Sequence, residues 1–303
     1  MTKHDRLIKQ LSQLGTEQAN PDTIDIDQLS AVEIVAKINA EDEKIAGVVR
    51  QALPEIAQAA EVFAAILRKG GRVFYIGAGT SGRLGVLDAA ECPPTFGSDP
   101  KQIIGIISGG YDTLVLSREG VEDDREAAVN DLKRLNFAKT DFLIGLAAST
   151  RTPYTLSGLE YAHSLGSKTA FIICNETADI PSWIDIAILL PVGPEVITGS
   201  TRMKSATAQK MTLNMISTTA MVLLGKTYGN LMVDLQARSE KLAARSRKIL
   251  IDLFDLSLSQ ADDLLDRSGG SVKTAIVMHQ FNCSREEALE KLQQAGGFIS
   301  KCR

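Results

Sequence analysis

The middle of the chain alternates short apolar runs with longer amphipathic stretches, and no other feature of the sequence constrains the fold as much. The apolar runs lie at residues 72–76, 103–107, 141–146, 169–174 and 184–190. Most are separated by stretches with helical spacing, at residues 84–90, 122–135 and 154–165. Short apolar strands that alternate with helices form parallel sheets covered on both faces. We therefore predict an α/β fold, with a parallel sheet sandwiched by helices.

Further helices are expected before the sheet. Ser30 and Glu33 form a capping-box pattern at the start of one helix. A second helix is expected to begin near Glu41, and Pro54 suits the first turn of a third, which ends at Gly70-Gly71. The polar residues 1–29 are expected to be extended or poorly ordered.

After Leu190 no further strand is expected. Residues 199–225 are rich in Met, Leu and Ala and predict one long helix, and residues 234–303 predict several shorter helices. The predicted organisation is therefore an N-terminal tail with helices, an α/β domain and a small C-terminal helical domain, with boundaries at 1–50, 51–230 and 231–303.

Composition argues against several classes of partner. The 303 residues carry a net charge of −4, so DNA, RNA and anionic membranes are poor candidates. No apolar run approaches the roughly 18–20 residues of a membrane-spanning helix, and the polar N-terminus has no signal-peptide pattern. The four cysteines are scattered without a C-x-x-C pair, so we expect a reducing, cytoplasmic location.

Two loops that each follow a strand and open a helix are candidates for binding a phosphate. Gly77-Ala-Gly-Thr-Ser-Gly82 combines glycines with the hydroxyls of Thr80 and Ser81, next to the positively polarised amides of a helix start. Ser149, Thr150 and Thr152 follow a later strand of the same sheet. The first loop could also be a plain turn or a dinucleotide-binding G-x-G-x-x-G loop, and the second could simply cap its helix.

Three longer motifs carry a family resemblance. The pairing of Gly77-x-Gly-Thr-Ser81 with Ser149-x-x-Thr152 resembles the sugar isomerase (SIS) domain, whose Ser/Thr loops hold the phosphate of a phosphosugar. Residues 193–204 and 207–210 resemble the signature shared by the glucokinase regulatory protein and N-acetylmuramic acid 6-phosphate etherases. Residues 77–95, 130–133 and 229–234 are similar to the etherases in particular. The resemblance, over about residues 20–300, implies an SIS-type sheet. The substrate-binding residues that it implies are Gly79, Thr80, Ser81, Ser149, Thr150, Thr152, Ser200 and Lys204, with Thr150 standing where the family usually has glycine.

The etherase family removes D-lactate from the 3-ether of N-acetylmuramic acid 6-phosphate and leaves N-acetylglucosamine 6-phosphate. Ring opening gives a C1 aldehyde that makes the C2–H acidic. One group must then remove this proton while another protonates the departing oxygen, and water adds at C3. His4, His163 and His279 lie in the N-terminal tail or within expected helices, which makes them poor candidates for this work. No metal or organic cofactor is required.

The resemblance implies that two glutamates form the acid/base pair. Glu91 lies before Cys92-Pro93-Pro94, where the double proline is expected to stop a helix, and Glu122 is expected to begin the next helix. Glu91 would protonate the lactate oxygen, which requires a pKa raised by roughly two units from about 4.3. Glu122 would help to remove the C2 proton. The neighbouring acids Glu119, Asp123 and Asp124 are expected on the solvated surface.

Three functions are compatible with these motifs. The main expectation is a cofactor-independent lyase, and a homodimer is expected because SIS domains usually pair. The alternative is a non-catalytic, sugar-phosphate-sensing regulator of the glucokinase regulatory protein type, which needs no glutamate pair. A third is an aldose–ketose isomerase. In every case the expected partner is a small phosphosugar.

Overall fold

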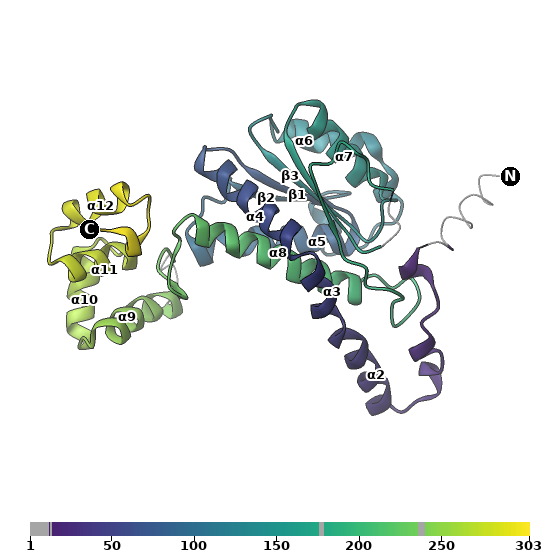
Figure 1. Cartoon of the computed structure of the whole chain (residues 1–303), viewed down its shortest axis with the longest axis horizontal. Coiled ribbons are helices and arrows are strands. Elements are labelled where there is room, and N and C mark those ends of the chain that lie inside the picture. Colours follow the sequence, from purple (N-terminus) through teal and green to yellow (C-terminus); the bar gives the residue numbers. More distant parts are fainter. Residues whose placement is uncertain (1–11, 13, 176–178, 236–239) are drawn as a thin grey trace. The chain divides into compact units, whose positions relative to one another are not determined.

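The computed structural model describes residues 12, 14–175, 179–235 and 240–303 and divides into two compact units (Figure 1). The first unit comprises residues up to 90 together with 101–217, and the second comprises 91–100 together with 218–303. His4 lies outside the described residues. The predicted domain boundaries at 50/51 and 230/231 stay predictions from the sequence.

A five-stranded parallel sheet forms the centre of the first unit and confirms the predicted fold class. Its strand order is β2-β1-β3-β4-β5. The strands are β1 (Val73–Gly77), β2 (Ile103–Ile107), β3 (Phe142–Ala147), β4 (Lys168–Ile173) and β5 (Ile186–Leu189). Gly77 pairs with Ile107 on one side and with Leu146 on the other, so three strands end together at one edge. Loops that follow these strands therefore meet at that edge.

Helices cover both faces of the sheet, as Figure 1 shows. On one face, Phe74, Leu143 and Phe171 pack with buried residues of α6 (Arg125–Arg134) and α7 (Pro153–Ser164). The other face carries Tyr75, whose ring lies 6.5 Å from that of Phe63 and whose hydroxyl donates to Asp88 at 2.8 Å. The helices there are α4 (Leu53–Arg68), α5 (Gly79–Phe96) and α8 (Lys204–Leu223).

Asp88 joins these elements, because it also accepts hydrogen bonds from Asn214 at 2.8 Å and Ser217 at 3.0 Å. Burial raises the pKa of Asp88, although the hydrogen bonds from Tyr75, Asn214 and Ser217 oppose the shift. The start of α8 at Lys204 is five residues later than the predicted start of its helix at 199.

Residues 14–29 are more regular than the sequence predicts. The capping box is confirmed: the Ser30 N–H donates to Glu33 at 2.9 Å at the start of α2 (Ala31–Glu43), which is followed by α3 (Ile45–Gln51). The expectation of an extended start is wrong for the described part of residues 1–29. Three 3₁₀ turns, η1 (Gly15–Glu17), η2 (Pro21–Thr23) and η3 (Ile26–Gln28), occur there, since Thr16, Asn20 and Thr23 are buried and hydrogen-bonded to distant loops.

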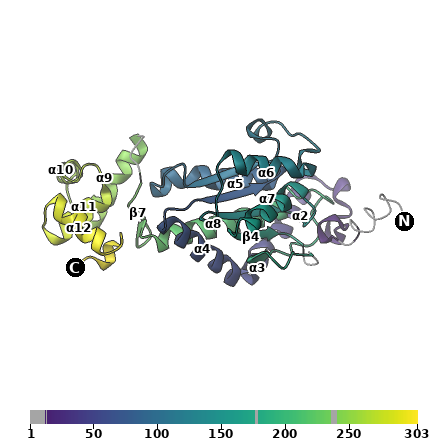
Figure 2. The same cartoon turned by 90° about the horizontal axis from the view of Figure 1, so that it is seen from above.

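The second unit contains the expected C-terminal helices and a hairpin that the sequence analysis missed. Helices α9 (Glu240–Phe254), α10 (Leu258–Arg267), α11 (Val272–Phe281) and α12 (Arg285–Gln294) share one apolar core, and a 3₁₀ turn, η6 (Ile299–Lys301), follows (Figure 2). The expectation that no strand follows Leu190 is wrong. Strands β6 (Thr227–Tyr228) and β7 (Leu231–Met232) pair antiparallel across a turn in which Gly229 has a φ of 55°.

No helix within the described ranges combines the length and the apolar character needed to cross a membrane.

Candidate functional site

The turn between β1 and α5 brings backbone unusually close to backbone. A Cβ on Gly82 would lie 2.6 Å from the Gly77 oxygen, and one on Gly77 would lie 2.8 Å from the Gly82 nitrogen. Gly79 has a φ of 53°, a conformation that side chains disfavour. The glycines therefore allow the tight turn that starts the 18-residue helix α5 directly behind the strand. Half-buried Thr80 and Ser81 lie in the first helical turn, where free amides favour an anion.

The second hydroxyl-rich loop connects β3 to α7. Ser149, Thr150 and Thr152 are half-buried there, and Pro153 occupies the first position of the helix. Thr152 is the N-cap residue, but its side chain makes no capping hydrogen bond. Helix capping therefore does not explain why a hydroxyl-bearing residue stands at position 152. This loop opens at the same sheet edge as the first, because β1 and β3 are parallel neighbours.

Glu122 lies in the loop that follows β2, at the same edge. It is half-buried within a 3₁₀ turn, η5 (Val121–Asp123). Buried Ser108, at the end of β2, donates to the Val121 oxygen at 2.5 Å and so fixes the main chain beside Glu122. The prediction that the next helix begins at Glu122 is wrong: Asp124 accepts from the Ala127 N–H at 2.9 Å, and this cap starts α6 at Arg125.

Glu91 lies in α5, and the prediction that this helix stops at the double proline is wrong. The helix continues through Pro93 and Pro94 to Phe96, and the Gly97 N–H donates to the Pro93 oxygen at 3.0 Å. Each proline removes one i→i−4 hydrogen bond and crowds the preceding turn, so the double proline weakens the last turn of α5 but does not end the helix before Phe96. Glu91 is solvent-exposed and belongs to the segment 91–100 of the second unit. Its pairing with Glu122 stays a prediction.

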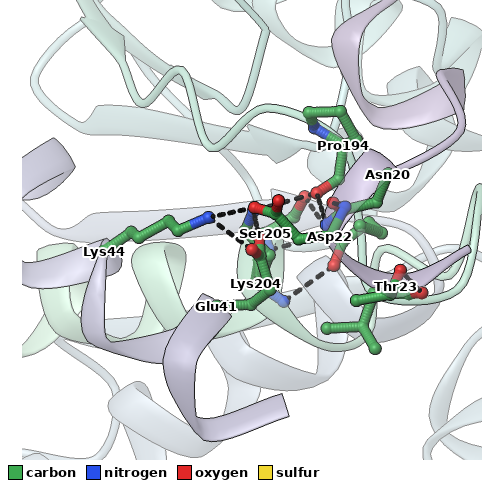
Figure 3. Close-up of polar contacts among 10 residues, drawn as sticks. Asn20, Asp22, Thr23, Glu41, Lys44, Pro194, Lys204 and Ser205 are labelled. Atoms are coloured by element: carbon green, nitrogen blue, oxygen red, sulfur yellow. Dashed lines mark hydrogen bonds and ion pairs between the residues drawn. The ribbon is translucent and has the colours of Figure 1, made fainter. Parts of the chain in front are cut away.

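Ser200 and Lys204 belong to the connection from β5 to α8. Ser200 is half-buried in a loop, whereas Lys204 is 2% exposed. The Lys204 ammonium donates to Glu41 at 2.5 Å and to the Pro194 oxygen at 2.9 Å (Figure 3). The Lys204 ammonium, which was predicted to contact the substrate, is thus bound by groups of the protein. Its direct contact with substrate stays a prediction.

Several buried polar residues near these loops were not singled out from the sequence. Glu195 is fully buried and accepts from the main-chain N–H groups of Lys204 at 2.9 Å and Ser205 at 3.0 Å, which caps α8. Asn175 donates to the Ala148 oxygen at 2.7 Å. Its place just after β4 was the available signal, since polar residues there reach the carboxyl edge of the sheet. Among the described residues, no cluster of His, Cys, Asp and Glu is arranged to hold a metal ion.

Relatives resemble this chain over almost their whole length. A protein named N-acetylmuramic acid 6-phosphate etherase from Exiguobacterium sp. is 50% identical over 95% of this chain and 98% of its own length. The etherase 2 of that name from Vibrio cholerae is 47% identical over 98% of this chain and 97% of its own. The chain belongs to the N-acetylmuramic acid 6-phosphate etherase family.

Two further comparisons agree with the fold of this etherase family member. The profile of the glucokinase regulatory protein N-terminal SIS domain matches residues 55–163, which contain the first three strands and both hydroxyl-rich loops. A solved structure from Bacteroides fragilis, described as a phosphosugar isomerase involved in capsule formation, has a TM-score of 0.50 at 19% identity and covers 71% of this chain and 97% of its own. The predicted family and SIS-type fold are confirmed.

Proposed function

We propose that this chain is an enzyme that cleaves the lactyl ether of N-acetylmuramic acid 6-phosphate, giving N-acetylglucosamine 6-phosphate and D-lactate. The observation that carries the proposal is the 50% identity to a named etherase across nearly the whole of both chains. The arrangement of hydroxyl-bearing loops at one sheet edge supports it, because a phosphosugar needs a local anion site on a chain of negative net charge.

The substrate phosphate would bind where the two strand-to-helix loops open. Main-chain amides near Gly79 and the hydroxyls of Thr80 and Ser81 would contact it from α5. The hydroxyls of Ser149, Thr150 and Thr152 would contact it from the start of α7, and Ser200 would add a further donor. Their half-buried side chains fit this role, since they are accessible to a ligand and lie within, or in the loops next to, the helices α5, α7 and α8.

The proposed reaction is a cofactor-independent elimination followed by hydration, which makes the protein a carbon–oxygen lyase. In the ring-opened sugar, Glu122 takes the C2 proton, the C3–O bond breaks, and Glu91 gives a proton to the departing lactate oxygen. The alkene that forms is conjugated with the C1 aldehyde. Water then adds through its oxygen at C3 while C2 regains a proton. Each glutamate ends in its starting protonation state.

We also propose that the protein works in the cytoplasm as a homodimer. Exposed apolar side chains in and before α2 support self-association, because Ile24, Val32 and Val35 are 78%, 72% and 59% exposed.

The test is lactate release from N-acetylmuramic acid 6-phosphate by the full chain and by the variants Glu122→Gln and Glu91→Gln. Both variants should fold and lose about 10²–10⁴-fold in kcat, as expected for removal of a general acid or base. The matched control is Glu119→Gln, an exposed acid in the same loop as Glu122, which should keep its activity. Tight phosphosugar binding without lactate release by the unaltered chain would favour the regulator instead.

A further inference from the structure

One buried threonine connects two of the proposed substrate loops. The main-chain N–H of Thr16 donates to Asn175 at 3.4 Å, and Asn175 in turn donates to the Ala148 oxygen beside Ser149. The Thr16 oxygen accepts from the Gly199 N–H at 3.0 Å, next to Ser200. Thr16 and Asn175 are each 1% exposed. The N-terminal segment is therefore hydrogen-bonded directly to the loop carrying Ser200 and, through Asn175, to the loop carrying Ser149.

A further hydrogen bond joins the N-terminal segment to the loop 193–203, which carries Ser200. The Thr23 hydroxyl donates to the Val196 oxygen at 2.8 Å. Farther along, Glu41 at the end of α2 receives the Lys204 ammonium on one carboxylate oxygen and the Lys44 ammonium on the other, and Lys44 also reaches Asp22 at 3.0 Å. Figure 3 shows these groups converging on the beginning of α8.

Lys204 is held from two sides. Its main-chain N–H is bound by Glu195, and its ammonium is shared by Glu41 and the Pro194 oxygen. Glu41 and Lys204 are each only 2% exposed. Removing the Glu41 charge leaves the Lys204 ammonium buried without an anionic partner, and removing the Lys204 charge leaves the buried Glu41 with the Lys44 charge alone. Ser200 precedes Lys204 by only four residues, and the Ser200 oxygen accepts from the Met203 N–H at 3.3 Å, so we expect a shift of Lys204 to move the loop that presents Ser200.

We propose that the Glu41–Lys204 ion pair is a positioning device for the phosphosugar site, which holds the loop 193–203 in place so that Ser200 can bind substrate. The inference rests on the proposed function. It gives Lys204 an indirect role: the lysine acts through the loop that it anchors and makes no contact with the substrate phosphate.

The experiment compares Lys204→Met, Glu41→Gln and the double variant in lactate release. If the pair positions the loop, both single variants should raise KM by about 10- to 100-fold, the effect of losing one hydrogen bond from Ser200 to the charged phosphate. A positioning role also predicts that kcat stays within about threefold and that the double variant is no worse than the poorer single one, because the two residues act together. Lys44→Met is the matched control: this lysine contacts the same carboxylate but is half exposed, and its KM should stay within about twofold.

A direct substrate contact by Lys204 predicts a different pattern. Lys204→Met would raise KM, but Glu41→Gln would leave KM unchanged or lower it, because the ammonium would be released toward substrate. That pattern overturns the proposal, as does an unchanged KM in both folded single variants. If a single variant does not fold, the double variant, which removes both charges, provides the measurement, and a wild-type KM in it overturns the proposal.

Calorimetric binding of N-acetylglucosamine 6-phosphate separates this proposal from the function on which it rests. Weaker binding by both single variants, with unaltered binding by Lys44→Met, supports the positioning role even if the unaltered chain releases no lactate, in which case only the proposed reaction fails. Absence of phosphosugar binding by the unaltered chain overturns both.

Discussion

Replacing Gly82 by alanine tests the close approach that forms the first phosphate loop. The added Cβ would meet the Gly77 oxygen at 2.6 Å and Ile107 Cγ1 at 2.7 Å. An ordinary carbon–oxygen contact is about 3.3 Å, so the first turn of α5 must move away from β1 by about 0.7 Å. Such overpacking destabilises a protein by about 1–3 kcal/mol. The displacement also moves the groups that would bind the phosphate, and the loss of one hydrogen bond to this charged group should raise KM by about 10-fold or more.

The assay is urea unfolding followed by circular dichroism, together with KM for lactate release. The control is Gly47→Ala in the exposed part of α3, where nothing lies within 4 Å of the added Cβ. This control should stabilise the protein by about 0.5–1 kcal/mol, because alanine favours a helix more than glycine does. An unchanged unfolding midpoint and KM for Gly82→Ala would refute the geometry of the turn and its role in binding.

Three further substitutions test stability. Burial raises the pKa of Glu41, but hydrogen bonds from its partners, chiefly Lys204 and Lys44, outweigh this and lower it to about 2. Its stabilisation, up to about 3 kcal/mol, should therefore be complete above about pH 4.5 and decrease as the pH falls toward 2. Glu41→Gln should lack this pH dependence in acid-unfolding titrations. A profile that matches that of the unaltered chain would contradict the stabilising role assigned to ionised Glu41. Asp141→Ala removes a buried carboxylate that binds Arg72 at 2.6 Å and should lower the unfolding free energy by about 2–4 kcal/mol. A loss within measurement error would show that this pair is not a structural anchor. Ser284→Ala removes the cap of α12 and should cost about 1 kcal/mol, measured by thermal unfolding, whereas an unchanged transition would count against the capping box.

The sheet could be predicted from sequence because its strands are apolar on both faces and bounded by turn residues. The observed β2 coincides with the run predicted at 103–107, and β1, β3 and β4 differ by a residue at either end. The hydroxyl-rich loops could be placed for the same reason, since a loop between a parallel strand and its helix has only one edge at which to open. The alternation of apolar strands with amphipathic helices therefore determines most of the fold.

Features decided by one local bond or by distant contacts could not be predicted in this way. Several neighbouring acidic residues could each cap α6, and only the structure shows that Asp124 does so. The hairpin β6–β7 has two-residue strands, which are too short to show any periodicity. Lys204 is a basic residue within a substrate-binding motif, and its partner Glu41 lies 163 positions away in the sequence. Nothing in the local sequence indicates that pair.

The central claim is that the ether is cleaved between the sugar and the lactyl oxygen by elimination and rehydration. It is tested most directly by letting the protein convert N-acetylmuramic acid 6-phosphate in heavy-oxygen water and locating the label by mass spectrometry. We predict one labelled oxygen in the C3 hydroxyl of N-acetylglucosamine 6-phosphate and unlabelled lactate. Label in the lactate hydroxyl, with none at C3, would mean that the other carbon–oxygen bond breaks and would contradict the proposed roles of Glu91 and Glu122.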